Sequence, residues 1–533
     1  MDSSIQTILT YTIIFCIIYI WIRWRRRKLM IFVDLGIPGP PPHILFGNIL
    51  ELNRKGPFRC HKEWIEKYGK IVGFFHGMKP ILLVAEPDLL KKILIKDFNL
   101  FSDRPESIPL RVRSFVDSII PATSIMDNLL ISLKGEKWRN VRSILSPTFS
   151  ANKLKMMIPA VNQVCDKALS VLEKECQRGE TIDILDMLQR LTLDIICAQA
   201  FAMDTDSVND PKDPLLTSAR IIFDLSFSSK IIFFGRCFPE LGFIAMIINF
   251  LRMFIRNNGN IPPLKITNVL DEIIKQRRKD PSCRKPDLLQ LLIDSSIEDT
   301  VFEKKKMDED GNPSETSTFS RKKQVLNDWE IKANALIVLL AGYETTSSSL
   351  AYAFHFLAKY PDLQQKIQEE IDSLIEKEGH FDYYKMSNFQ LTERFLLETM
   401  RFYSPTMNFI CRICTENVDY GHVKIPKGME ILVPDHYIHH SEEFWEQAEE
   451  FNIDRHLPGS TTKKHPISYL AFGEGPRRCI GVRLVNITAK IIIARILQKY
   501  TVELVENHEK VKSVLRAFTM VPENVYVKLK PRT

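Results

Sequence analysis

Long helices dominate the pattern of apolar and polar positions along this chain. From Asp328 to about Tyr360, apolar residues fall on nearly every face of the predicted helix, so this helix should pass through a core rather than lie on a surface. Asn327 and Asp328 stand where an N-cap belongs. A second helix, near Asp362–Lys377, is amphipathic. The pattern therefore predicts a mainly α protein.

Strands are few and short in this pattern. The stretches rich in β-branched and aromatic residues are Lys70–Val84, Val418–Val433 and Val525–Leu529, and we expect them to form small sheets beside the helices. Residues 298–323 are charged and rich in serine and threonine, and they show no apolar period. This composition predicts a solvated loop.

The N-terminus carries a separate apolar segment, Ile5–Ile22, of nearly the length that crosses a bilayer. Five basic residues follow it between Arg23 and Lys28, whereas Asp2 is the only charged residue before it. By the positive-inside rule, the basic side stays in the cytosol. We predict an N-terminal membrane anchor at residues 1–28, a proline-rich hinge at 29–42 and a globular part at 43–533.

A second apolar run, Leu241–Ile255, is short for a membrane span and is interrupted by Asn249 and Arg252. Two interpretations remain open from the sequence. The run is either a helix of the core or a helix that lies on one leaflet of the bilayer near the anchor.

Charge and cysteine content restrict the function further. The chain has 72 basic and 65 acidic residues, a net charge of +7, which suits an anionic membrane surface or an acidic partner protein. This excess is too small to indicate binding to nucleic acid. The 10 cysteines of the 533 residues are scattered without disulfide spacing, as in proteins of a reducing compartment.

The most informative segment is FGEGPRRCIG, from Phe472 to Gly481, directly before a predicted helix. A thiolate at Cys479 could bind a metal, and the helix N-terminus and the N–H groups of the glycine-rich turn should favour this anion. Phe472 could shield the sulfur from water. Arg477 offers a cation to a carboxylate of the bound cofactor. A thiolate as axial ligand of haem iron favours O–O cleavage.

A phosphate-binding loop and a structural cysteine fit this segment less well. A phosphate-binding loop would need a third glycine where Arg478 stands, and no strand–helix unit surrounds the segment. A buried structural cysteine would not need the arginine and the turn glycines. Cys411 and Cys414 have the spacing of a zinc knuckle, but no second pair accompanies them.

The cysteine segment resembles the FxxGxRxCxG pattern of the cytochrome P450 superfamily of haem-thiolate monooxygenases. The runs AGYETTSS (Ala341–Ser348) and LSPTFS (Leu145–Ser150) look most like the 3A subfamily and its relatives, which include thromboxane synthase. The resemblance implies the fold of this family, a mainly α prism with small β-sheets, as one catalytic domain over 43–533. It also implies haem b and the endoplasmic reticulum membrane, with the catalytic domain on the cytosolic side.

The central helix should line the haem site. Ala341 and Gly342 remove bulk where a flat ring could lie. The Thr345 hydroxyl can donate to the Ala341 carbonyl one turn earlier, which loosens the helix and admits water. The resemblance assigns proton delivery to Thr345, and Glu344 is the neighbouring acid that could supply the protons.

Glu398 and Arg401 stand one turn apart on a predicted helix with apolar neighbours, so they should form a buried ion pair. The family pattern adds an arginine from an FxPxRF segment, which Arg455 matches. This chain has Ile453 in place of the proline and His456 in place of the last aromatic. We assign the three charged residues to folding around the haem rather than to chemistry.

The remaining expectations rest on the resemblance. Trp138 and Arg142 lie one turn apart, and with Arg412 and Arg477 they should hold the haem propionates. The substrate pocket should be lined by five segments or positions: 111–132, Phe223–Ser228, Leu340, Thr406–Phe409 and Phe518–Met520.

The chain carries no flavin or nicotinamide fingerprint, so electrons must come from a separate protein. The resemblance implies an NADPH-dependent flavoprotein reductase, with cytochrome b5 as a second candidate donor. The basic residues expected to face the reductase are Lys134, Lys137, Arg139, Arg478, Arg483 and Lys490. We expect oxygen insertion into small apolar substrates such as xenobiotics, steroids or fatty acids. A peroxide isomerase of the thromboxane synthase kind and a non-enzymatic haem sensor are the alternatives.

Overall fold

The computed structural model describes residues 3–105, 125–224, 230–256, 261–296, 325–375, 381–406, 408–460, 462, 465–506, 508–516 and 519–532. Within these ranges the first half of the chain forms α1 (Ser3–Leu29), α2 (Ile31–Asp34), α3 (Ile49–Lys55), α4 (Pro57–Tyr68), α5 (Pro87–Lys91), α8 (Gly135–Leu145), α9 (Ala151–Gln177), α10 (Ile184–Phe201), α11 (Pro214–Asp224), α12 (Lys230–Cys237) and α13 (Gly242–Arg256). The second half forms α14 (Pro262–Lys279), α15 (Leu288–Asp294), α16 (Asp328–Lys359), α17 (Pro361–Leu374), α18 (Tyr383–Ser387), α19 (Gln390–Phe402), α20 (Asp435–His439) and α21 (Val482–Lys499). The predicted loop 298–323 lies outside the described residues.

Small sheets accompany the helices, as predicted. One sheet has the order β1 (Ile71–His76), β2 (Lys79–Val84), β7 (Glu430–Leu432), β4 (Cys411–Ile413). Another has the order β3 (Ile182–Asp183), β11 (Tyr526–Pro531), β8 (Tyr500–Leu504), and two pairs join β9 (Ser513–Arg516) to β10 (Thr519–Pro522) and β5 (Val418–Asp419) to β6 (Lys424–Ile425). In the first sheet, only β2 and β7 run parallel. All three stretches predicted as β-rich thus contain strands.

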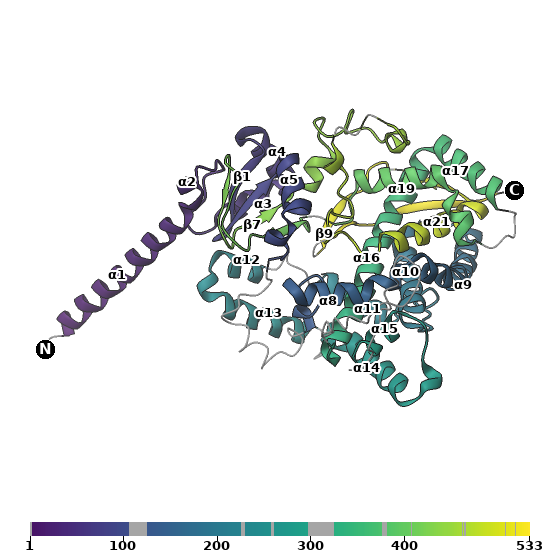
Figure 1. Ribbon diagram of the computed structural model, residues 1–533, viewed down its shortest axis with the longest axis horizontal. Coiled ribbons are helices and arrows are strands. Elements are labelled where there is room, and N and C mark those ends of the chain that lie inside the picture. Colours follow the sequence, from purple (N-terminus) through teal and green to yellow (C-terminus); the bar gives the residue numbers. More distant parts are fainter. Residues whose placement is uncertain are drawn as a thin grey trace, which may run out of the picture.

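Helix α16 passes through the centre of the helical region, where Figure 1 shows it between α10, α11 and α21. Its start is fixed by a capping box, because Asn327 accepts from the Glu330 N–H at 3.0 Å and Glu330 accepts from the Asn327 N–H at 2.9 Å. Nearly all its side chains are buried, as an apolar pattern on all faces predicts. The predicted amphipathic helix is α17, which ends at Leu374, three residues before the expected end.

The N-terminal helix α1 projects away from the rest of the molecule (Figure 1). Within the described residues it is the one helix long and apolar enough to cross a membrane, over Ile5–Leu29, and none of its most apolar window is buried. The segment 29–42 that follows packs along the first sheet. Phe32 is buried there, and the Gly73 N–H donates to the Pro38 carbonyl at 2.9 Å.

Helix α13, which contains most of Leu241–Ile255, exposes an apolar face. Ile244, Ile248, Leu251 and Ile255 are exposed by 41–72% and follow one another at helical spacing on one face. A core helix would bury this face, so that interpretation is wrong. The apolar stripe belongs to the molecular surface.

Candidate functional site

The cysteine loop is closed by its own backbone hydrogen bonds. The Cys479 N–H donates to the Phe472 carbonyl at 2.9 Å, and the Gly473 N–H donates to the Leu470 carbonyl at 2.8 Å. Gly475 has φ +75°, and a Cβ there would lie 1.9 Å from the Leu94 carbonyl oxygen. Only glycine fits this position, because both its backbone conformation and the contact with Leu94 exclude a side chain. Helix α21 begins three residues after Cys479.

The Cys479 side chain is accessible, yet many protein atoms lie around it. Burial raises the pKa of the Cys479 thiol, and this effect outweighs the Gly481 N–H and the charges of Arg142, Arg478 and Arg104, which lower it. The Gly481 N–H and the three arginines thus favour the thiolate, whereas the loss of bulk water around the sulfur disfavours it.

The middle of α16 also has an accessible residue among buried ones. Ala341 is exposed although its neighbours Leu340 and Tyr343 are buried. The Thr345 hydroxyl donates to the Ala341 carbonyl at 2.6 Å, which is the predicted hydrogen bond. Gly342 lies on the side of α10, where an added Cβ would come within 3.0 Å of Ile196. Its lack of a side chain lets the two helices approach each other closely.

Glu344 is buried in α16 against α10. One carboxylate oxygen accepts from the Gln189 amide at 3.4 Å, and the other has no hydrogen-bond partner among the described residues. Burial raises the pKa of this carboxyl to about 7, while Arg516 and Arg220 act in the opposite direction. Glu344 is therefore a group that can exchange a proton near neutral pH.

Four arginines converge beside the cysteine loop: Arg104, Arg142, Arg412 and Arg477. Burial, followed by repulsion from Arg104 and Arg412, lowers the pKa of Arg477 to about 8. Burial and the charge of Arg104 lower the pKa of Arg412 to about 9. Asp103 offsets part of this charge at Arg477. The described cluster has an excess of positive charge and lacks a matching anion.

Some nitrogen atoms of these arginines donate hydrogen bonds, and others have no partner among the described residues. Arg477 donates to the carbonyls of Ser102 at 2.9 Å and Leu133 at 2.6 Å. Arg142 donates to the Arg478 carbonyl at 2.6 Å. The Nε atoms of Arg104 and Arg412 are buried without a partner among the described residues.

Two of these cations lie close to the Trp138 ring. The guanidinium of Arg477 is 4.2 Å from the centre of its ring, and that of Arg142 is 5.9 Å away. The predicted one-turn pair of Trp138 and Arg142 is therefore present on α8. The indole ring can therefore interact favourably with both cations.

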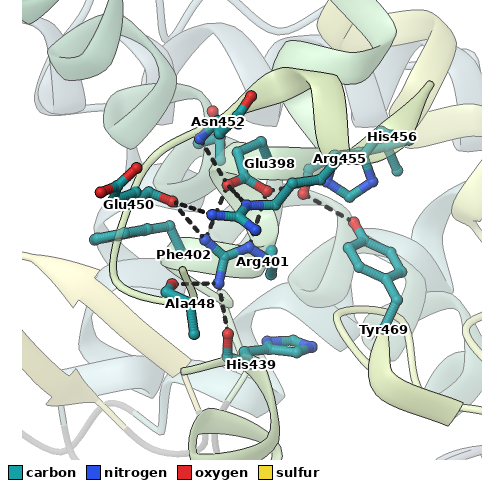
Figure 2. Close-up of polar contacts among 12 residues, drawn as sticks. Glu398, Arg401, Phe402, His439, Ala448, Glu450, Asn452, Arg455, His456 and Tyr469 are labelled. Atoms are coloured by element: carbon teal, nitrogen blue, oxygen red, sulfur yellow. Dashed lines mark hydrogen bonds and ion pairs between the residues drawn. The ribbon is translucent and has the colours of Figure 1, made fainter. Parts of the chain in front are cut away.

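The predicted ion-pair trio forms a fully buried network, which Figure 2 shows. Arg401 donates twice to Glu398, at 2.8 Å each, and Arg455 Nε lies 3.3 Å from the same carboxylate. His456, which replaces the expected aromatic residue, adds a contact of 3.0 Å to Glu398. Burial alone would raise the pKa of Glu398, but the hydrogen bonds from His456 and Arg401 lower it to about 2.

This network reaches the cysteine loop through His439. Arg401 donates to the His439 carbonyl at 2.5 Å, and His439 Nε2 accepts from the Leu470 N–H at 2.9 Å. Leu470 in turn accepts from Gly473 within the loop. The buried charges thus fix the position of a loop that is distant from them in sequence.

Two segments predicted to line the substrate pocket lie together. Thr406 pairs with Thr519 in an isolated β-bridge, and the Met520 N–H donates to the Pro405 carbonyl at 3.0 Å. Phe223 of α11 lies 6.1 Å from the ring of Tyr343 on α16. Residues 111–124, 225–228, Met407 and Phe518 of the predicted pocket lie outside the described residues.

The prediction that Lys490 faces an electron donor is wrong. Lys490 is buried, and its ammonium donates to Glu393 at 2.8 Å and to the Met386 carbonyl at 3.2 Å. It lies on the inner face of α21, which the spacing of basic residues in the sequence does not reveal. Arg139, Arg478 and Arg483 are exposed.

Comparison with known proteins explains this arrangement. The family model described as Cytochrome P450 matches residues 37–529. The chain belongs to the cytochrome P450 family. It is 29% identical to mouse cytochrome P450 3A41 over 99% of this chain and 97% of the mouse protein. It is 30% identical to human cytochrome P450 3A5 (94% and 91% covered) and 30% identical to the golden hamster lithocholate 6-beta-hydroxylase (98% and 96% covered).

Membership of the cytochrome P450 family implies haem iron as cofactor, and the described residues fit this group. The Cys479 side chain is free and accessible, so its thiolate could bind the iron. The excess of buried guanidinium groups, with two orphan Nε atoms, matches the anionic propionates that haem carries. Cys479 would hold the iron, and the four arginines would hold the propionates. Among the described residues there is no alternative cluster of three or more metal-binding side chains.

Sequence reasoning missed Arg104 and His439. Arg104 stands in an irregular segment before Pro105, and no local pattern distinguishes it from a surface arginine. His439 stands beside His440 in the sequence, and this pair suggests only a metal ligand, which adjacent side chains rarely share. Its contact with Leu470 depends on two segments that meet only in the folded chain.

Proposed function

We propose that this cytochrome P450 is a membrane-anchored monooxygenase that inserts one atom of dioxygen into small apolar molecules. The second oxygen atom leaves as water, which requires two electrons and two protons for each turnover. The observation that carries the proposal is the accessible Cys479 thiol inside the molecule beside buried arginines that lack an anion. Haem iron bound to that thiolate supplies dioxygen activation.

The described residues of α16 support a role in proton supply. The Thr345 hydroxyl is held by the Ala341 carbonyl at 2.6 Å, next to the exposed surface of Ala341. Glu344, with a pKa of about 7, can take up a proton and release it near neutral pH. We assign proton delivery to Thr345 and proton storage to Glu344. A peroxide isomerase would need neither function, because rearrangement of a peroxide consumes no protons.

The apolar residues at the predicted pocket positions support a class of substrate. Leu340, Phe223 and Met520 are apolar, and they favour lipids, steroids or xenobiotics over charged metabolites. One relative is named lithocholate 6-beta-hydroxylase. For this chain we propose the class of lipids, steroids or xenobiotics, and not lithocholate in particular.

We further propose that residues 1–28 anchor the enzyme in the endoplasmic reticulum membrane, with 29–42 as the hinge and the domain 43–533 in the cytosol. The exposed apolar surface of α1 supports this location. Electrons would come from an NADPH-dependent flavoprotein reductase, and cytochrome b5 is a second candidate donor. Arg139, Arg478 and Arg483 are the exposed cations near the cysteine loop that could meet an acidic donor surface.

The test is spectroscopic and catalytic. The reduced, carbon-monoxide-bound protein should give the absorption of a thiolate-ligated haem, and Cys479→Ser should abolish it. NADPH oxidation with the reductase should then be coupled to oxygenated product from a lipid and drug panel. Turnover of an endoperoxide without NADPH would instead assign the isomerase reaction. A histidine-like spectrum that survives Cys479→Ser would refute the proposed site.

A further inference from the structure

Arg25 differs from the other basic residues that follow the apolar segment of α1. Its side chain is completely buried, whereas Arg23, Arg26, Arg27 and Lys28 are exposed. A buried guanidinium destabilises a protein unless hydrogen bonds and opposite charge compensate the loss of water. Arg25 therefore has a role beyond that of a cytosolic positive charge.

The contacts of Arg25 join three segments of the chain. One terminal nitrogen donates to the carbonyls of Ile44 at 3.2 Å and Leu45 at 3.1 Å. The other donates to the Cys237 carbonyl at 2.6 Å and lies 3.4 Å from the Glu240 carboxylate. The same guanidinium thus bonds the end of the anchor to the loop before α3 and to the junction of α12 and α13.

Two aromatic rings lie against the buried charge. The guanidinium lies 4.5 Å from the ring centre of Trp21, on α1 itself, and 4.9 Å from that of Phe238, directly after α12. Such an enclosed cation–π arrangement is more stabilising than an exposed one. It also restricts the direction in which α1 leaves the domain.

The end of α12 is in turn fixed to the first sheet. The Met78 N–H donates to the Arg236 carbonyl at 3.2 Å, and a Cβ at Gly77 would lie 2.1 Å from that oxygen. The turn between β1 and β2, the end of α12 and the base of α1 are therefore packed together. Figure 1 shows α1 leaving the molecule beside this sheet, with α12 and α13 next to it.

We propose that Arg25 is a positioning residue that sets the orientation of the catalytic domain on the bilayer. It holds α1 at a fixed angle to α12 and α13, so that the apolar stripe of Ile244, Ile248, Leu251 and Ile255 meets the acyl chains of the membrane that α1 crosses. Lipid is the occupant that fits, because α1, whose apolar surface is exposed, is joined to the start of α13 by the contacts of Arg25. The inference rests on the membrane anchoring proposed above.

Loss of Arg25 should leave the protein in the membrane but free its orientation. The apolar segment of α1 is intact without it, so the anchor persists. Without the guanidinium, however, the base of α1 becomes a pivot, and α13 would spend less time against lipid. Arg26→Ala removes the same charge from the next residue, which is exposed, and is the matched control.

The experiment uses the full chain with haem in phosphatidylcholine nanodiscs. A photoreactive benzoylphenylalanine replaces Leu251, and mass spectrometry measures its cross-linking to lipid. We expect Arg25→Ala to lower this cross-linking about tenfold, the scale of a lost charge-assisted hydrogen bond. Arg26→Ala should leave it unchanged. Arg25→Lys, which keeps the charge but lacks the planar fork, should give an intermediate value.

The outcomes separate the inference from the proposed function. The carbon-monoxide spectrum verifies that each variant is folded, and Arg25→Lys serves if Arg25→Ala is not. If the unmodified chain leaves the membrane on alkaline washing, the proposed anchoring is wrong. If it stays but cross-linking at position 251 is equal in the Arg25 and Arg26 variants, anchoring stands and the role of Arg25 is refuted.

Discussion

Replacement of Glu398 by glutamine tests how far the buried charges stabilise the domain. The carboxylate is completely buried, and the side chains of Arg401, Arg455 and His456 contact it. Its pKa falls from 4.5 to about 2. At about 1.4 kcal/mol per pH unit, this difference corresponds to about 3 kcal/mol of stability at neutral pH. Removing one partner of a buried ion pair independently suggests about 3–5 kcal/mol.

The lowered pKa also predicts how this loss of stability changes with pH. Because the pKa is lowered in the folded state, the stabilisation is present above pH 4.5 and is lost as the pH falls toward 2. Glu398→Gln should therefore cost about 3 kcal/mol at pH 7 and progressively less below pH 4.5. Guanidinium unfolding, followed by haem absorbance and tryptophan fluorescence at pH 7, 4.5 and 3.5, measures the difference.

Asp454 provides the matched control. Its ion pair with Arg394, at 2.8 Å, lies two residues from His456, but the carboxylate is 66% exposed. Asp454→Asn should change the stability by less than about 1 kcal/mol, because solvent screens such a pair. The reasoning fails if both variants lose similar stability, or if the loss in Glu398→Gln is the same at pH 7 and pH 3.5.

Three further predictions concern the site itself. Glu344→Gln should remove a fall in stability of about 1.4 kcal/mol per pH unit that the unmodified protein shows between pH 4.5 and 7, because in this range the carboxyl is protonated in the folded chain but ionised in the unfolded one. Thermal unfolding at pH 5 and 7 measures it. Arg104→Leu should stabilise the haem-free protein, because it relieves repulsion among the arginines. It should also speed the loss of haem to an acceptor globin about tenfold or more. Stabilisation without faster haem loss would contradict the role assigned to the arginines. Thr345→Ala should lower the product formed per NADPH about tenfold, whereas Thr345→Ser, which keeps the hydroxyl, should not; equal coupling in both variants would exclude the hydroxyl from proton delivery.

Local signals in the sequence predicted the elements that build the site. The start of α16 follows from a capping box, which needs only Asn327 and Glu330 three residues later. The cysteine loop follows from turn glycines, and its Gly475 is required by a positive φ. The pair of Glu398 and Arg401 follows from helical spacing. These features depend on residues within a few positions of one another, and they can therefore be recognised in the sequence.

The tertiary structure alone decided which charges lie inside the molecule. Arg25 and Lys490 look like surface cations in the sequence, yet each is buried among groups from distant segments. Arg104 joins a cluster of like charges for which no local pattern exists. The α13 stripe is exposed although an apolar run of its length would equally suit a core. Burial is a property of the contacts between segments, and because it sets both the pKa values and the cost of an unpaired charge, the electrostatics of this site could be obtained only from the folded chain.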